Sequence, residues 1–179
     1  MPIQGEIPSG HVPEETDDFF VEVDENTGRY FNVPKIIKVH NPMTGDKMDG
    51  TFRLDPTNGS AIEISTYVHP TTEIGFSVII GADGRIMSSN EQPTVIGNDV
   101  FIEDRVYIKP GVNIGDNATI RRKAELEYNV TIGENATVGS RAIVRNRAII
   151  EPGAQVFNRE IVYSREIIPN VPRVNPNRH

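Results

Sequence analysis

An aliphatic residue occupies every sixth position of the chain from 96 to 156 without interruption. The series consists of Ile96, Ile102, Ile108, Ile114, Ile120, Leu126, Ile132, Val138, Val144, Ile150 and Val156. A small or β-branched residue stands two places before each member, as Thr94 does before Ile96. A period of six matches neither the 3.6-residue turn of an α-helix nor the simple alternation of an ordinary strand. It predicts short strands separated by corners, which is the pattern of a parallel β-helix.

The same period is present earlier in the chain, and it is displaced once. Its first members are Ile62, Val68, Ile74, Ile80 and Ile86. The step from Ile86 to Ile96 is ten residues instead of six, so we expect an insertion within Met87–Pro93 that bulges at one corner. Three six-residue repeats form one coil, so residues 18 apart should stack on successive coils. The repeats together predict about five coils.

The displacement also brings four glycines into one column, each of them directly after a core isoleucine. They are Gly75, Gly97, Gly115 and Gly133. Glycine permits close approach of a neighbouring backbone. The column is therefore a candidate for packing between subunits.

The regions outside the repeat have a different character. Residues 1–18 are rich in proline and carboxylates and are expected to form an extended arm. Residues 19–55 contain short apolar runs around turns and predict a region of short strands and hairpins. The β-helix is expected over 56–159, and the proline-containing residues 160–179 are expected to form an extended C-terminal tail.

The charge of the chain is unevenly distributed. The formal net charge is −7, and residues 1–25 contain eight carboxylates without a lysine or arginine, so the remainder carries about +1 (−7 minus −8). The body therefore gives no support for nucleic-acid binding through bulk charge. The absence of cysteine excludes disulfides and thiolate ligands. Because no signal peptide and no apolar run of about 18 residues is present, we expect a protein of the cytoplasm, or of a particle assembled there, without a membrane partner.

The repeat resembles the hexapeptide-repeat family. Val68-His-Pro-Thr-Thr-Glu-Ile-Gly75 is similar to the first coil of the family's acyltransferases, and Thr94-Val-Ile-Gly-Asn-Asp-Val100 is similar to a typical later coil. The resemblance covers about 62–156 and implies an all-β protein with a left-handed parallel β-helix, assembled as a homotrimer with clefts between subunits. It does not single out a function, because acyltransferases, γ-class carbonic anhydrases and structural subunits share this fold.

The chemistry of those enzymes has no clear counterpart in this chain. Hexapeptide acyltransferases commonly use a histidine as general base, and only His69 lies in the repeat region. The family's histidine in this His-Pro-Thr setting opens the β-helix, so we interpret His69 as structural. The positions that match the zinc ligands of γ-class carbonic anhydrases hold Met87, Asp104 and Lys109, which is not a zinc-binding set. We therefore assign no catalytic residue, cofactor or metal ligand; the catalytic alternative is a carboxylate such as Glu125 or Asp104 at a subunit cleft.

Charged residues 18 apart form columns on the predicted coils. Lys109, Glu127 and Arg145 alternate in sign, as favourable cross-strand pairs do. A second column contains only cations, and its members are Arg105, Lys123, Arg141 and Arg159. Because like charges about 4.8 Å apart repel, we expect an anionic partner. The alternatives are the acidic arm of the same or a neighbouring subunit, a phosphate-bearing ligand such as the pantetheine donor of an acyltransferase, or solvent alone.

Two classes of function remain open. The missing base and metal ligands favour a non-catalytic, trimeric structural protein, such as a component of a virion or another large particle. Such a protein would contact neighbouring subunits or another protein through its N- and C-terminal arms. The alternative is a CoA-dependent hexapeptide-type acyltransferase with a sugar or small-amine acceptor.

Overall fold

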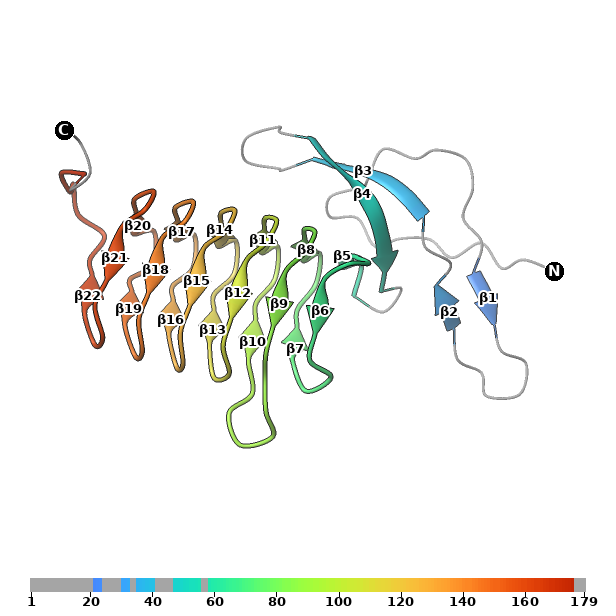
Figure 1. Cartoon of the computed structure of the whole chain (residues 1–179), viewed down its shortest axis with the longest axis horizontal. Coiled ribbons are helices and arrows are strands. Elements are labelled where there is room, and N and C mark those ends of the chain that lie inside the picture. The colour runs from blue at the N-terminus through green and yellow to red at the C-terminus, as the bar shows by residue number, and fades with distance from the viewer. Residues whose placement is uncertain (1–20, 24–29, 33–34, 41–46, 56–57, 176–179) are drawn as a thin grey trace.

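The computed structural model describes residues 21–23, 30–32, 35–40, 47–55 and 58–175 of the chain. Every regular element in these ranges is a strand, and most of them build a parallel β-helix whose coils stack in one row (Figure 1). The all-β parallel β-helix predicted from the six-residue period is thereby confirmed. Within the described residues there is no helix whose length and apolarity would let it span a bilayer.

Three parallel sheets form the sides of the β-helix. The first sheet contains Glu73–Ile74 (β7), Val95–Ile96 (β10), Asn113–Ile114 (β13), Thr131–Ile132 (β16), Ile149–Ile150 (β19) and Ile167–Ile168 (β22). The second sheet contains Ala61–Glu63 (β5), Ile79–Ile80 (β8), Phe101–Ile102 (β11), Thr119–Ile120 (β14), Thr137–Val138 (β17) and Gln155–Val156 (β20). The third sheet contains Tyr67–Val68 (β6), Arg85–Ile86 (β9), Tyr107–Ile108 (β12), Glu125–Leu126 (β15), Ile143–Val144 (β18) and Ile161–Val162 (β21).

Antiparallel strands precede the coils. Lys47–Leu54 (β4) pairs with β5 and with Lys35–His40 (β3), so it extends the second sheet at its N-terminal end. Val21–Val23 (β1) and Tyr30–Asn32 (β2) form a separate antiparallel pair. All four strands fall within the region 19–55 for which short strands and hairpins are expected.

The register of the sheets confirms the stacking interval and the insertion. Ile96 pairs with Ile114, and Ile114 pairs with Ile132, each 18 residues further on. Ile74 pairs with Ile96 across 22 residues, so four residues leave the regular path between them. They bulge in the long loop between β9 and β10 (Figure 1).

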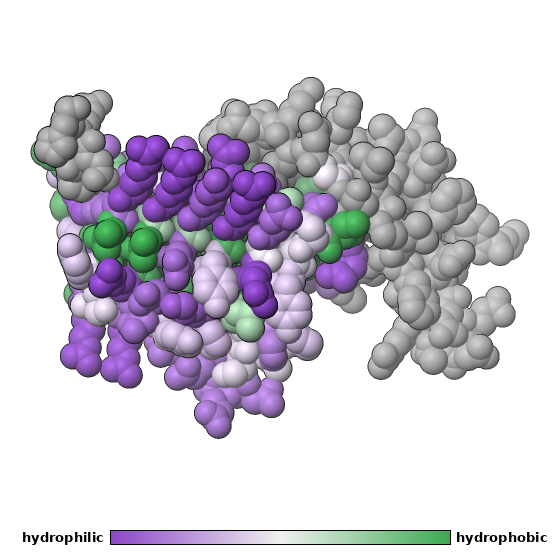
Figure 2. Space-filling view, in the orientation of Figure 1, coloured by the Kyte–Doolittle hydropathy of each residue, from purple (hydrophilic) through white to green (hydrophobic). Residues whose placement is uncertain are grey.

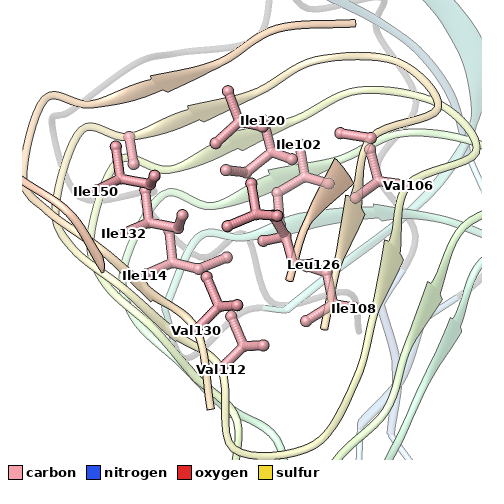
Figure 3. Close-up of a cluster of buried hydrophobic side chains, with 14 of the residues drawn as sticks. Ile102, Val106, Ile108, Val112, Ile114, Ile120, Leu126, Val130, Ile132 and Ile150 are labelled. Carbon is pink, nitrogen blue, oxygen red and sulfur yellow. The ribbon is translucent and has the colours of Figure 1, made fainter. Parts of the chain in front are cut away.

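The aliphatic series fills the interior. Ile114, Ile132 and Ile150 lie one above another in a single column (Figure 3) and are at most 1% exposed. Each buried side chain of this size contributes roughly 1.5–3 kcal/mol. The small residues two places earlier, such as Ala118 and Ala136, are also fully buried and let the chain close each corner.

The β-helix is longer than predicted. We expect its end at residue 159 and a tail from 160, but β21 and β22 add one strand each to the third and first sheets. Val162 and Ile168 keep the six-residue period and are buried. The accompanying small residue two places earlier is absent here, since Glu160 and Glu166 take its place. Each sheet contributes six parallel strands, which gives six coils rather than about five.

A partly buried ion pair takes the place of the alanine in the last coil. The Glu160 residue is 6% exposed, and its carboxylate accepts a hydrogen bond from the backbone N–H of Phe157 at 2.7 Å. The same carboxylate contacts the guanidinium of Arg173, which also donates to the Gln155 carbonyl at 3.1 Å. These contacts fasten the segment after β22 to the end of the β-helix.

Candidate functional site

Three corners join the sheets, and each repeats one backbone turn. From Asp99 to Arg165 every sixth residue has a positive φ. This left-handed conformation suits glycine and asparagine but costs most other residues roughly 1–2 kcal/mol. The corners differ in the side chains that they place there, and so they differ in chemistry.

The corner between the first and second sheets, which we name the amide corner, uses residues suited to the turn. Its positive-φ residues are Ser77, Asp99, Asn117, Asn135 and Gly153. The predicted glycine column lies beside this corner: a Cβ on Gly115 would be 2.7 Å from the backbone N of Glu134, and one on Gly133 would meet the backbone N of Pro152. The glycines are therefore required by the next coil of the same chain. Their packing between subunits stays a prediction.

The corner between the second and third sheets, which we name the cationic corner, carries the predicted column of cations. Its positive-φ residues are Asp83, Arg105, Lys123, Arg141 and Arg159. The four cations are exposed on successive coils, and a row of strongly hydrophilic side chains follows this edge of the coils (Figure 2). Arg105 pairs with Asp83 at 3.4 Å.

The corner between the third and first sheets, which we name the pocket corner, contains a shallow cavity of about 300 Å³. Its lining consists of Tyr128, Asn129, Asn146, Arg147, Ser164 and Arg165. Arg147 and Arg165 are the positive-φ residues of two successive coils, so their backbones lie about 4.8 Å apart. Two guanidinium groups with neighbouring amide and hydroxyl groups can bind an anion such as a phosphate.

A charged cluster adjoins this cavity. The ammonium of Lys109 lies 3.7 Å from carboxylate oxygens of both Glu125 and Glu127 and 5.3 Å from the centre of the Tyr128 ring. Glu127 also accepts a hydrogen bond from the backbone N–H of Asn146 at 3.2 Å, which leaves Glu125 as the carboxylate with fewer structural contacts. The predicted Lys109–Glu127 pair is present, whereas the guanidinium of Arg145 lies 5.8 Å from the Tyr163 ring centre.

His69 lies at the same corner on the first complete coil. Its Nδ1 is 2.9 Å from the hydroxyl of Thr71 and faces the Thr71 backbone N–H at 3.3 Å, so this nitrogen is held in a local turn. The Thr71 hydroxyl donates a hydrogen bond of 2.9 Å to the hydroxyl of Ser88, in the loop between β9 and β10. His69 stacks three coils away from Glu127, which places its backbone about 14 Å from the cavity. A structural role for His69 agrees with these contacts.

The residues aligned with zinc ligands lie at two different corners. Asp104 lies at the cationic corner, where its carboxylate accepts the backbone N–H of Ala82 at 3.0 Å. Met87 and Lys109 lie at the pocket corner, where Lys109 is occupied by its two carboxylates. In the part of the chain that the structure describes, no group of three or more His, Cys, Asp and Glu side chains could hold a metal ion.

The cavity residues are absent from the sequence-based candidates. Arg147 and Arg165 are 18 residues apart, as the other columns are, but Arg165 lies beyond the predicted end of the β-helix. A β-helix continued to Ile168 would have revealed the pair. Tyr128 gives no signal of its own in the sequence.

These coils define a β-helix of hexapeptide repeats, and comparison with protein families identifies the same repeat. Residues 93–127 match the model described as bacterial transferase hexapeptide (six repeats). Residues 129–155 match the hexapeptide repeat of succinyl-transferase. Hexapeptide repeats are thus recognised over most of residues 93–155 of the chain. None of the curated proteins gives a significant match.

Solved structures share the fold at low sequence identity. The acetyltransferase domain of PglB from Neisseria gonorrhoeae has a TM-score of 0.57 and 18% identity over 62% of this chain and 52% of its own. The same domain in complex with acetyl coenzyme A has a TM-score of 0.57 and 19% identity over 62% and 51%. A mutant perosamine N-acetyltransferase from Caulobacter crescentus, in complex with CoA and GDP-perosamine, has a TM-score of 0.48 and 21% identity over 60% and 50%. This chain thus spans about half the length of these proteins.

The expectation of a non-catalytic assembly protein is wrong. The acetyltransferase domain of PglB shares the fold, and one of its two structures is a complex with acetyl coenzyme A. The expectation gave too much weight to the missing histidine base.

Proposed function

We propose that this chain binds an acyl-coenzyme A and transfers its acyl group to a small nucleophile. The observation that carries the proposal is the cavity at the pocket corner, where Arg147 and Arg165 lie beside amide and hydroxyl groups. A concave site with a few converging polar groups is typical of small-molecule binding. The acetyltransferases that share the fold support the same choice of donor.

The lining matches the chemistry of the donor. The nucleotide end of coenzyme A carries phosphates, which Arg147 and Arg165 would bind through charge-assisted hydrogen bonds. The side chains of Asn129, Asn146 and Ser164 would add neutral hydrogen bonds. The cavity is shallow, so a second subunit beside this corner would complete the enclosure of the donor, in keeping with the trimer expected for the family.

Glu125 is the general base that the geometry favours. In the reaction an amine or hydroxyl of the acceptor attacks the thioester carbonyl, the carboxylate of Glu125 takes the proton, and the thiolate of coenzyme A leaves. Asp104 is the less suitable carboxylate, because it binds the backbone of Ala82 at another corner. The ammonium of Lys109 lies 3.7 Å from the Glu125 carboxylate and would help to hold it in position.

Calorimetric titration with acetyl-CoA tests the donor site. The Arg147→Asn/Arg165→Asn variant removes both charges while keeping a residue that tolerates positive φ, as Asn129 does at the same corner. We expect acetyl-CoA to bind the native chain and to bind this variant at least tenfold more weakly. The matched control is Arg141→Asn/Arg159→Asn at the cationic corner, which should bind as the native chain does.

Turnover is tested separately by release of free thiol from acetyl-CoA with a panel of amino sugars. Glu125→Gln should bind acetyl-CoA normally and lose turnover, because the amide does not accept the proton. Absence of acetyl-CoA binding at millimolar concentration would contradict the proposed function. Equal weakening by the control pair would place the donor at the cationic corner instead.

A further inference from the structure

The cationic corner carries a charge that the described coils do not balance. Its cations on the fourth to sixth coils are Lys123, Arg141 and Arg159, and all three are exposed. Within the described residues none of the three forms an ion pair, in contrast with Arg105, which pairs with Asp83. The unbalanced charge is therefore confined to the C-terminal half of this corner.

The acidic groups nearby are already engaged. Glu103 accepts the backbone N–H of Arg122 at 2.8 Å, and Asp104 accepts that of Ala82 at 3.0 Å. Glu160 is buried and contacts Arg173. None of these carboxylates forms an ion pair with Arg141 or Arg159, while Arg122 adds another exposed cation beside Lys123.

The backbone conformation at these three positions is unfavourable for a lysine or arginine, which indicates that their charge has a role. Lys123, Arg141 and Arg159 have φ values of 62°, 60° and 61°, a conformation that favours glycine or asparagine. The amide corner has asparagine at φ 57° in the same turn, at Asn117 and Asn135. A long cation at this place therefore has a conformational cost that its charge must offset, and strained residues of this kind mark functional positions.

The chain itself contains a complementary segment. Residues 1–25 contain eight carboxylates and no lysine or arginine. Glu15 and Asp18 are three residues apart, so an extended segment would separate them by about 10 Å, which is close to two coil spacings of about 4.8 Å each. That separation matches the one between Lys123 and Arg159, which lie on coils two apart.

We propose that the acidic segment before β1, residues 6–18, docks along the cationic corner, on its own β-helix or on that of a second copy of the chain. Exposed ion pairs are screened by salt, so the docking weakens as ionic strength rises. The cationic corner is then an interaction surface separate from the proposed donor cavity. The inference does not depend on acyl transfer.

A spin label on the full-length chain tests the docking. Because the chain has no cysteine, Thr16→Cys provides a unique labelling position between two carboxylates. At low salt we expect the label to rotate several-fold more slowly than at 1 M salt. Lys123→Asn/Arg141→Asn/Arg159→Asn should remove the slow component, and asparagine keeps the turn intact. Arg147→Asn/Arg165→Asn at the pocket corner is the matched control and should retain it.

Mixed assemblies distinguish docking of the acidic segment on its own chain from docking on a neighbouring copy. Labelled chains with the neutralised corner are combined with unlabelled chains that keep the native corner. A slow label supports docking on a neighbouring copy, and a fast label supports docking on the same chain, provided that the native labelled chain is slow.

A label that rotates freely in the native chain at low salt would overturn the proposal. An equal loss of the slow component in the control variant would also overturn it, because the effect would then follow total charge rather than this corner. Circular dichroism and melting curves of each variant separate these results from unfolding. If the native label is free while polyphosphate binds only the chain with the intact corner, an external polyanion replaces the acidic segment as the partner.

Discussion

The amide corner and the cationic corner repeat one backbone turn but carry different side chains on it, neutral amides in one and cations in the other. Asn117 and Asn135 have φ 57°, whereas Lys123 and Arg141 have φ 62° and 60°. Asparagine tolerates this conformation, but lysine and arginine gain nothing from it. The amide corner is therefore organised for stability, and the cationic corner gives up some stability to display charge. Two corners with the same backbone turn can thus have side chains with different roles.

The largest expected difference between the corners comes from the glycine beside the amide corner. Gly133→Ala should destabilise the fold by about 3 kcal/mol, because its Cβ would meet the backbone N of Pro152 in the next coil. The control is Arg121→Ala, which follows Ile120 as Gly133 follows Ile132 and should change stability by less than about 0.5 kcal/mol. Urea denaturation measures both. Equal losses would show that the two corners are packed alike.

The next effect concerns the last coil, where the cationic corner contains the partly buried Glu160–Arg173 ion pair and the amide corner contains Ala154. Arg173→Ala should cost about 2 kcal/mol, because it leaves the buried carboxylate of Glu160 without its cation. The double variant Glu160→Ala/Arg173→Ala should recover part of the loss. A double-mutant cycle by thermal and urea unfolding measures the coupling. No recovery would mean that the contact of Arg173 with the Gln155 carbonyl matters more than the ion pair.

A cation introduced at the amide corner should show how much stability a cation costs in this turn. Asn135→Arg should destabilise the fold by about 1 kcal/mol, because arginine replaces a residue that tolerates φ 57°. The denaturation midpoint should fall while the slope of the transition is unchanged. Asn135→Gly is the control and should leave stability close to that of the native chain. If Asn135→Arg leaves the free energy of unfolding unchanged, the backbone conformation of the cationic corner is no longer a reason to regard it as functional.

The smallest expected effect is the reverse exchange. Arg141→Asn should stabilise the fold by about 0.5 kcal/mol, since it relieves the turn and reduces repulsion along the column. The gain should be larger at low salt than at high salt, because exposed charges are screened. Lower stability of Arg141→Asn at low salt would be the contrary result, and it would indicate that a carboxylate of residues 1–25 already compensates this charge.

Much of the fold was predictable because its core is linear in the sequence. The six-residue period gives the inward residues directly, and Ile114 and Ile132 stack as their spacing of 18 requires. The insertion between β9 and β10 was visible as a single displaced step. The last coil was missed because Glu160 and Glu166 replace small residues. The charge of Glu160 is compensated there by the backbone N–H of Phe157 and by Arg173, which is thirteen residues away.

The candidate site was less predictable than the fold. The column of Arg105, Lys123, Arg141 and Arg159 follows from the spacing alone. Its backbone strain does not, because φ is a property of the folded corner. The cavity at the pocket corner depends on how Tyr128, Asn146 and Arg165 from different coils converge. Such convergence carries no local signal.

The sequence by itself determined the repeat, the inward column and the order of the corners, because in a β-helix each six-residue unit makes the same local choice of strand and turn. Only the tertiary structure decided which corner is concave, which carboxylates are engaged, and where the coils end. These properties depend on side chains from neighbouring coils and on the geometry between them. A one-dimensional period predicts which residues stack but not what the stacked residues enclose.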